Sequence, residues 1–167
     1  MKYSIVFSSQ TGNTAALAEK VREQLPKEDC VYYGSPGKAA LSAQVIFLGF
    51  WTDRGSCDAD TISFLKKLHK KTIYLFGTAG FGQNDDYFIK VLNNIEKELP
   101  VGNKIRSSFM CQGKMQSSVR KKYEEMLAVN PQNEKMAEMI NNFDKALNHP
   151  NNDDFDNLSK WLERIVK

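Results

Sequence analysis

The sequence is poor in cysteine and histidine. Three cysteines, Cys30, Cys57 and Cys111, occur in 167 residues, and no two of them have the C-x-x-C spacing. An odd number of widely separated cysteines argues against a disulfide framework and a zinc site, and favours reduced thiols. The only histidines are His69 and His149, too few for a histidine-rich metal site, so we expect no bound metal.

Long apolar runs and a leader segment are also missing. The longest apolar runs, such as residues 45–51, are far too short to span a bilayer. Residues 1–7 contain a short apolar run, but no cleavage-site pattern follows it. We therefore expect no signal peptide, no membrane insertion and a cytoplasmic location.

No charge of one sign is in large excess. Lys and Arg number 23 against 20 Asp and Glu, which gives a net charge of +3 and a pI of about 8.7. Basic residues do not form a stripe interleaved with aromatic residues, so this mild excess argues only weakly for nucleic-acid binding, and we expect no such partner. The length fits one domain with a sizeable core, and we predict a single domain over residues 1–167.

The first two thirds of the chain alternate between short apolar runs and helical patterns. Several apolar runs lack polar alternation, which is typical of parallel strands covered on both faces. We expect strands at residues 2–8, 30–33, 45–50, 72–78 and 104–111, and helices at residues 13–25, 60–68 and 85–99. This alternation predicts an α/β fold, a doubly wound five-stranded parallel sheet with helices on both faces.

The last third of the chain differs, because it contains three segments with a helical pattern and no further strand. Apolar residues recur at helical spacing from Val119, from Met136 and from Phe155. Asn130-Pro131 and His149-Pro150 mark the breaks between these helices. We interpret residues 113–150 as a helical addition that follows the fifth strand.

The helical addition is rich in methionine. It carries Met115, Met126, Met136 and Met139 among basic residues such as Arg120. We expect these methionines to pack the extra helices onto the sheet. The alternative is a methionine-bearing surface for a redox partner or a substrate.

The loop after the first expected strand has the composition of a phosphate cradle. It runs straight into a helix, whose N-terminus offers unpaired N–H groups and the positive end of the helix dipole. Gly12 permits close approach of a ligand to the backbone, and Ser9, Thr11 and Thr14 can donate hydroxyl hydrogen bonds. The cradle comprises Ser8, Ser9, Gln10, Thr11, Gly12, Asn13 and Thr14. No Gly-Lys-Ser/Thr follows, so it is not a Walker A loop.

At this loop the sequence resembles the flavodoxins. The pattern I-V-F-x-S-x-x-G-x-T-x-x-x-A-x-x-V over residues 5–21 fits the flavodoxin signature at every defined position. The resemblance implies the strand order 2-1-3-4-5 and one bound FMN, whose terminal phosphate this loop would hold. It also implies that the loops after the third and fourth strands would grip the flavin ring.

Those two loops join glycines to large aromatic residues, which suits a flat ring. Trp51 and Phe81 are the aromatic candidates for the two faces of the ring. The alternative is that Trp51 only ends a buried strand and Phe81 only anchors its loop. The expected cofactor-binding residues here are Phe50, Trp51, Thr52, Gly55, Thr78, Ala79, Gly80, Phe81, Gly82 and Asp85.

Two neighbouring residues bear on the redox properties that the resemblance implies. Gly55 is our candidate for the flexible glycine, whose peptide in flavodoxins turns its carbonyl toward N5 of the flavin. Arg54 departs from the acidic surroundings common in flavodoxins, and it would favour the anionic, fully reduced flavin. Alternatively, Arg54 points into solvent or pairs with Asp53 or Asp58. Cys57 and Cys111 have no histidine nearby in sequence, and we expect structural thiols there.

The resemblance implies an electron carrier that shuttles between a reductase and a terminal redox enzyme through transient contacts. An alternative is an FMN-dependent oxidoreductase of the quinone or tetrapyrrole (protoporphyrinogen) type on the same fold. A third is a binding module that has lost its cofactor, which the intact cradle argues against. No catalytic acid, base or nucleophile stands out in the sequence.

Overall fold

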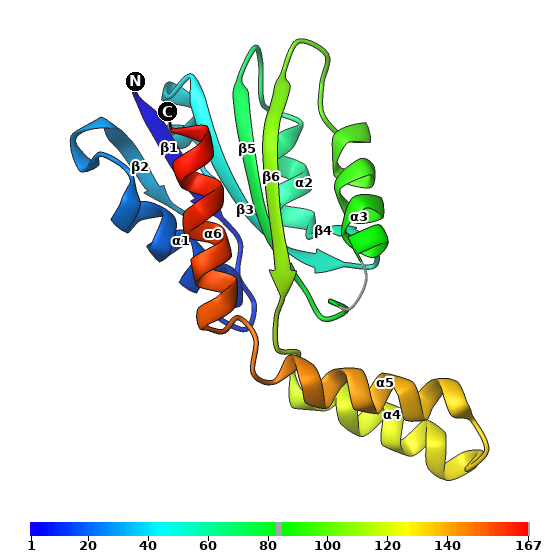
Figure 1. Cartoon of the computed structure of the whole chain (residues 1–167). Coiled ribbons are helices and arrows are strands. Elements are labelled where there is room, and N and C mark those ends of the chain that lie inside the picture. The colour runs from blue at the N-terminus through cyan, green and yellow to red at the C-terminus, as the bar shows by residue number, and fades with distance from the viewer. Residues whose placement is uncertain (83–84, 167) are drawn as a thin grey trace.

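The computed structural model describes residues 1–82 and 85–166, with a parallel sheet at its centre (Figure 1). The order along the sheet is β2-β1-β3-β5-β6, with the strands β1 (Tyr3–Phe7), β2 (Cys30–Gly34), β3 (Val45–Asp53), β5 (Thr72–Ala79) and β6 (Lys104–Gln112). A further strand, β4 (Ser56–Cys57), turns back antiparallel against the end of β3. The predicted fold and strand order are confirmed. Strand β4 was missed because two residues are too few to show the alternating apolar pattern of a strand.

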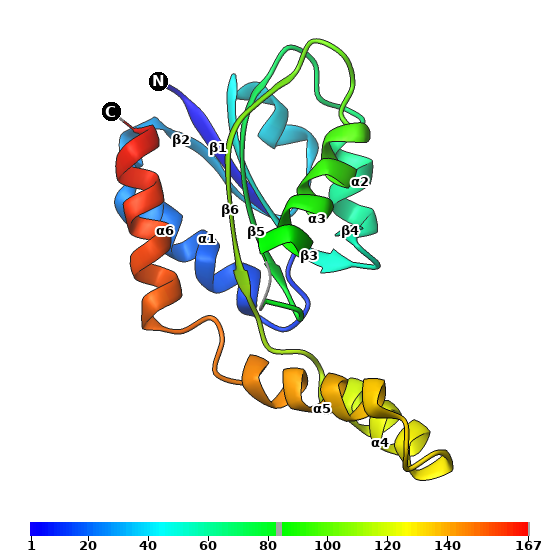
Figure 2. The ribbon, with the colours of Figure 1, turned by 45° about the vertical axis from the view of Figure 1, so that its right-hand side comes forward.

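Helices cover both faces of the sheet (Figures 1 and 2). One face carries α1 (Asn13–Gln24) and α6 (Asn152–Ile165), and the other carries α2 (Ala59–Leu65) and α3 (Asp85–Lys97). Buried residues divide in the same way: Leu17 and Leu158 pack with Ile5 in one cluster, while Leu65 packs with Val6 in the other. Two short 3-10 turns, η1 (Lys27–Asp29) and η2 (Lys38–Ser42), precede β2 and β3.

Two glycines let β3 and β5 carry large aromatic residues side by side. Phe50 lies opposite Gly77 and Gly49 lies opposite Phe76 in the register of these strands. A Cβ at Gly77 would lie 2.3 Å from Cζ of Phe50, and one at Gly49 would lie 2.4 Å from Cε2 of Phe76. Both rings are fully buried, so each occupies the space that a larger residue on the adjacent strand would need.

The helical addition forms a hairpin of α4 (Ser117–Val129) and α5 (Glu134–Ala146) that projects away from the sheet (Figures 1 and 2). In the described part of the chain these two helices pack mainly on each other. Our expectation that the methionines pack these helices onto the sheet is therefore wrong. Arg120 of α4 joins them through an ion pair of 2.8 Å between its Nε and Oδ1 of Asp144, and it lowers the pKa of that carboxyl.

The two ends of the hairpin meet in a narrow neck. Gly113 donates its N–H to the carbonyl of Ala79 at 2.9 Å, and Lys114 donates its N–H to the carbonyl of His149 at 2.9 Å. The chain therefore leaves the sheet and returns to it at nearly the same place. No helix in residues 1–82 and 85–166 has the length and apolar character needed to cross a membrane.

Candidate functional site

The loop between β1 and α1 forms an anion cradle at the carboxyl edge of the sheet. Gly12 takes a left-handed conformation, with φ of 87°, and open space surrounds the position where its Cβ would lie. Oγ of Ser9 accepts from the N–H of Ala15 at 3.2 Å and so supports the first turn of α1. Among the described residues, no acceptor meets the N–H groups of residues 9–14. These N–H groups and the helix dipole can hold an anion.

Hydroxyl groups tie this loop to the ends of β3 and β5. The Thr14 hydroxyl is fully buried and lies 3.1 Å from the carbonyl of Phe50, to which it donates, and 3.2 Å from Oγ1 of Thr78. Thr52 donates its hydroxyl to the carbonyl of Thr78 at 2.9 Å. The three loops that the sequence singled out therefore start from one hydrogen-bonded base.

A tight turn after β3 forms the second side of the site. Arg54 and Gly55 occupy the turn between β3 and β4 with φ of 48° and 79°. Asn94 of α3 donates to the carbonyl of Gly55 at 2.9 Å and holds the turn in place. The Arg54 side chain is 93% exposed, and its Nε lies 3.7 Å from Oδ1 of Asp53. Its charge therefore stands at the rim of the site and in contact with water.

Between the loops lies a cavity of about 360 Å³, a size typical of ligand sites. The sheet and its loops contribute one part of the lining, namely Gln10, Thr11, Asn13, Trp51, Thr52, Asp53, Arg54, Thr78, Ala79, Gly80, Phe81 and Tyr87. The neck and the first turns of α4 contribute Gly113, Lys114, Met115, Gln116, Val119 and Tyr123. The projecting hairpin thus supplies a wall of the cavity.

The cavity brings together about half of the predicted cofactor-binding residues. Those that line it are Gln10, Thr11, Asn13, Trp51, Thr52, Thr78, Ala79, Gly80 and Phe81. Gly12 lines an adjacent hollow that Thr11 and Asn13 share, and Gly82 lines a groove beside α5.

The remaining predicted residues lie outside these linings. Phe50 and Thr14 are fully buried beneath the loops. Ser8 donates its N–H to the carbonyl of Gly49 at 3.1 Å, and Ser9 supports α1 as described. Gly55 forms the turn after β3, and Asp85 is exposed in the first turn of α3. Their predicted contacts with the cofactor stay predictions.

Sequence reasoning missed the contribution of the neck. A Cβ at Gly113 would lie 2.4 Å from Nδ2 of Asn13, so the chain passes very close to the anion cradle. Nδ2 of Asn13 donates to the carbonyl of Lys114 at 2.8 Å, and the Thr11 hydroxyl donates to the same carbonyl at 3.3 Å. A glycine directly after the last strand, at the edge where the other loops gather, was the available signal.

Burial raises the pKa values of three titratable groups in and near the site. Desolvation raises the pKa of Tyr87, which keeps its hydroxyl protonated as a donor at the cavity wall. Burial and the neighbouring Asp58 raise the pKa of Cys57 to about 12, and burial also raises the pKa of Cys111. Both thiols therefore stay protonated at neutral pH, in line with a structural role.

Comparison with known proteins shows which family the chain belongs to. The family model described as a flavodoxin domain matches residues 4–163, nearly the whole chain. The chain belongs to the flavodoxin family. Among curated proteins it is 42% identical to the flavodoxin-like domain-containing protein BilS of Clostridium symbiosum, with 97% of this chain and 94% of that protein covered. It is 32% identical to BilS of Clostridioides difficile, with 99% and 97% covered.

Solved structures agree on the fold of this flavodoxin. Oxidised flavodoxin 2 from Bacillus cereus superimposes with a TM-score of 0.62 at 16% identity, over 99% of this chain and 98% of that one. A flavodoxin from Streptococcus pneumoniae gives 0.60 at 16% identity, with 99% and 98% covered. A Lactobacillus acidophilus flavoprotein, solved in complex with FMN, gives 0.51 at 12% identity, with 65% and 92% covered.

FMN is the cofactor of this flavodoxin, and the residues present fit it. The unpaired N–H groups of the first loop suit its phosphate, and Trp51 and Phe81 border the cavity beside that loop. Oδ1 of Asn13 is buried and has no hydrogen-bond partner in the described part of the chain, as expected for a group left free for a ligand. Bound FMN supplies electron-transfer chemistry, while the chain binds and orients it.

Proposed function

We propose that this flavodoxin carries electrons between a reductase and a redox enzyme. The observation that supports the proposal is the convergence of three loops on one cavity, with free N–H groups in the first loop and an aromatic residue in each of the other two. Partner proteins would approach FMN at this edge of the sheet, beside the α4–α5 hairpin. The proposal places the protein in the cytoplasm, where its three free cysteines would stay reduced.

The test is whether reduction needs a second protein. We expect NADPH alone to leave the FMN-loaded protein oxidised under anaerobic conditions, as followed by flavin absorbance. Adding a flavodoxin reductase should then reduce it, in two resolved one-electron steps. Rapid reduction by NADH or NADPH without a reductase would contradict the carrier function.

A second candidate is an FMN-dependent oxidoreductase that acts on a small quinone or tetrapyrrole. It is favoured by a groove of about 660 Å³ that adjoins the cavity and is lined by Phe81, Gly82, Tyr87, Glu138, Met139, Asn141 and Asn142. Phe81 and Tyr87 border both spaces, so a flat molecule in the groove would lie close to the flavin. Steady turnover of such a molecule with NADPH and no reductase would favour this candidate.

Arg54 provides a charge test of the site. We expect the potential for full reduction of FMN to be less negative in the wild-type protein than in Arg54→Glu, by tens of millivolts, because a positive charge at the rim stabilises the anionic reduced flavin. The difference should shrink with added salt, since this side chain is exposed. Spectroelectrochemical titration measures it.

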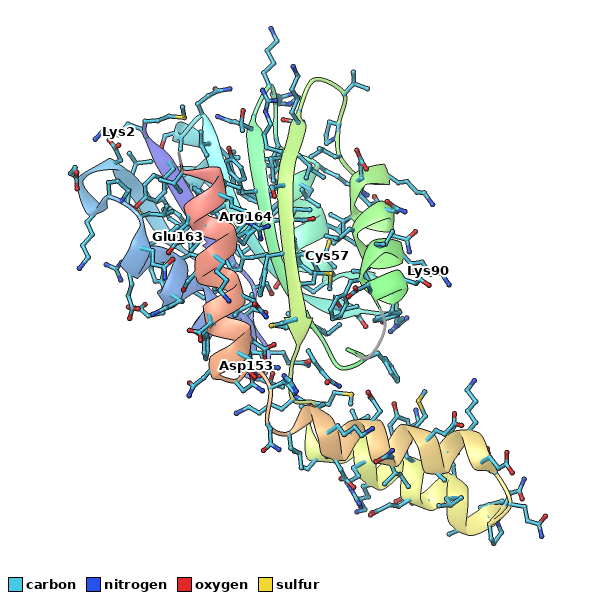
Figure 3. All side chains as sticks on the ribbon, viewed as in Figure 1. Lys2, Cys57, Lys90, Asp153, Glu163 and Arg164 are labelled. Atoms are coloured by element: carbon cyan, nitrogen blue, oxygen red, sulfur yellow. The ribbon has the colours of Figure 1, made fainter. Side chains whose placement is uncertain are left out.

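A matched control for this test is Arg164→Glu. Arg164 lies near the end of α6, toward the opposite end of the sheet from the site (Figure 3). This substitution changes the net charge equally and should leave the potential within a few millivolts of wild type, because a Debye length at physiological salt is only about 8 Å. Equal shifts of the potential in both variants would show that the effect of Arg54 does not come from a place near the flavin.

A further inference from the structure

The carbonyl of Gly80 is held by two side-chain amides. It accepts from Nε2 of Gln112 at 2.9 Å and from Nδ2 of Asn142 at 3.1 Å. Nε2 of Gln112 also donates to Oδ1 of Asn142 at 3.1 Å, so the three groups form one closed network. We refer to Gly80, Gln112 and Asn142 as the amide latch. It joins the end of β6 and the middle of α5 to the loop that carries Phe81.

The latch is buried and closely packed. Gln112 is only 7% exposed and Asn142 only 8%. Burial of an amide is costly unless its groups find partners, and here both NH2 groups and Oδ1 of Asn142 find them in the latch. A Cβ at Gly82 would lie 2.3 Å from Cβ of Gln112, and one at Gly80 would lie 2.4 Å from Sδ of Met115. The loop at residues 80–82 is therefore pressed against the residues around it.

The two amides of the latch lie outside the lining of the cavity, whereas the loop they hold lies in it. Gln112 and Asn142 are absent from the residues that line the flavin cavity, whereas Gly80 and Phe81 line it. In a trans peptide the N–H points opposite to the carbonyl, so the N–H of Phe81 is directed away from the two amides. No acceptor meets that N–H in residues 1–82 and 85–166, which leaves it available to a ligand. The Phe81 ring packs edge-on against Tyr87, with centroids 5.7 Å apart.

We propose that Gln112 and Asn142 are positioning residues for the flavin ring. By holding the Gly80 carbonyl on the hairpin side, they present the N–H of Phe81 and its ring to the isoalloxazine. The inference rests on the proposed place of the ring in this cavity. Asn142 belongs to α5, so the hairpin, whose helices pack mainly on each other, is linked directly to the surroundings of the flavin.

The test replaces Asn142 by aspartate. Asn142→Asp keeps the size of the side chain but puts a second acceptor against the Gly80 carbonyl, which should turn this peptide away. We expect about tenfold weaker binding of both FMN and riboflavin, since about one hydrogen bond to the ring is lost. The visible circular dichroism of the bound flavin and its midpoint potential should also change. Asn142→Leu removes the donor without adding charge, and it should also weaken flavin binding. It replaces the aspartate variant in the test if that variant fails to fold.

The control is Gln132→Leu, at an exposed residue in the turn between α4 and α5 that lines neither the cavity nor the groove. It should leave flavin affinity, dichroism and potential at wild-type values. The inference is overturned if the Asn142 variants fold, bind flavin and match this control in all three measurements. Failure of the wild-type protein to bind riboflavin while it binds FMN would instead refute the ring placement. A wild-type protein that binds both flavins but accepts electrons from NADPH alone would refute only the carrier function.

Discussion

Replacing Gly12 by aspartate should weaken FMN binding about 100-fold relative to replacement by asparagine. Open space surrounds the Cβ position of Gly12, so either side chain fits. Asn and Asp tolerate the left-handed conformation that this residue adopts better than other residues do. The two variants therefore share their backbone strain and differ in one negative charge beside the N–H groups that would receive the phosphate. That repulsion is worth about 3 kcal/mol at a partly exposed site.

Fluorescence titration of FMN with each Gly12 variant measures this difference. Riboflavin has no phosphate, so its affinity should be nearly equal in the two variants, and unfolding curves without flavin should coincide. If the aspartate and asparagine variants bind FMN within threefold of each other, the phosphate does not lie at this loop.

Replacing Gly77 by alanine should destabilise the fold by about 2–4 kcal/mol. The new Cβ would lie within 2.6 Å of three atoms of the Phe50 ring, which is fully buried and has no space to move into. Because Phe50 and Gly77 lie on adjacent strands directly below the flavin loops, flavin affinity should fall as well. Urea unfolding of the flavin-free protein measures the change in the free energy of unfolding.

A double-mutant cycle checks the cause. Phe50→Leu alone should destabilise the protein by about 1–2 kcal/mol because it leaves a void. In the Gly77→Ala background the same change should cost less, or should stabilise the protein, since it relieves the close contact. Additive effects of the two substitutions would show that the destabilisation has another origin.

The sequence predicts the parts of the site that depend on local structure. The cradle at residues 8–14 could be found because a strand, a glycine turn and a helix follow one another within a short segment. The contact between Thr11 and the carbonyl of Lys114 joins residues 103 positions apart, and no local pattern encodes it. The individual contacts of the hairpin wall could not be predicted for that reason, although a methionine-bearing surface for a redox partner or a substrate was the alternative that the sequence left open for this segment.

The role of individual hydroxyl groups was also beyond local reasoning. Thr14 was named as a hydroxyl donor of the cradle, and in the structure its hydroxyl donates to the carbonyl of Phe50, while its contact with the cofactor stays a prediction. A hydroxyl in the first turn of a helix can donate to a ligand or to the backbone, and the choice depends on which carbonyl comes within reach after folding. Tyr87 was missed as a lining residue because it lies in α3, outside the three loops that the sequence singled out. In the fold its ring packs edge-on against Phe81 and lines the cavity beside it.

The neck at Gly113, Lys114 and His149 has a consequence for how such chains diversify. The backbone leaves the sheet and returns to it at nearly the same place. For the sheet, inserting the α4–α5 segment therefore costs the closure entropy of one loop, and this cost grows slowly with the length of the segment. Beyond the cavity wall of α4 and beyond Asn142 of α5, helices of other lengths or sequences could be exchanged while the sheet and the anion cradle stay intact. The outer part of the hairpin is therefore the part of this flavodoxin that can vary most freely, because the base of the hairpin supplies its contacts with the flavin loops.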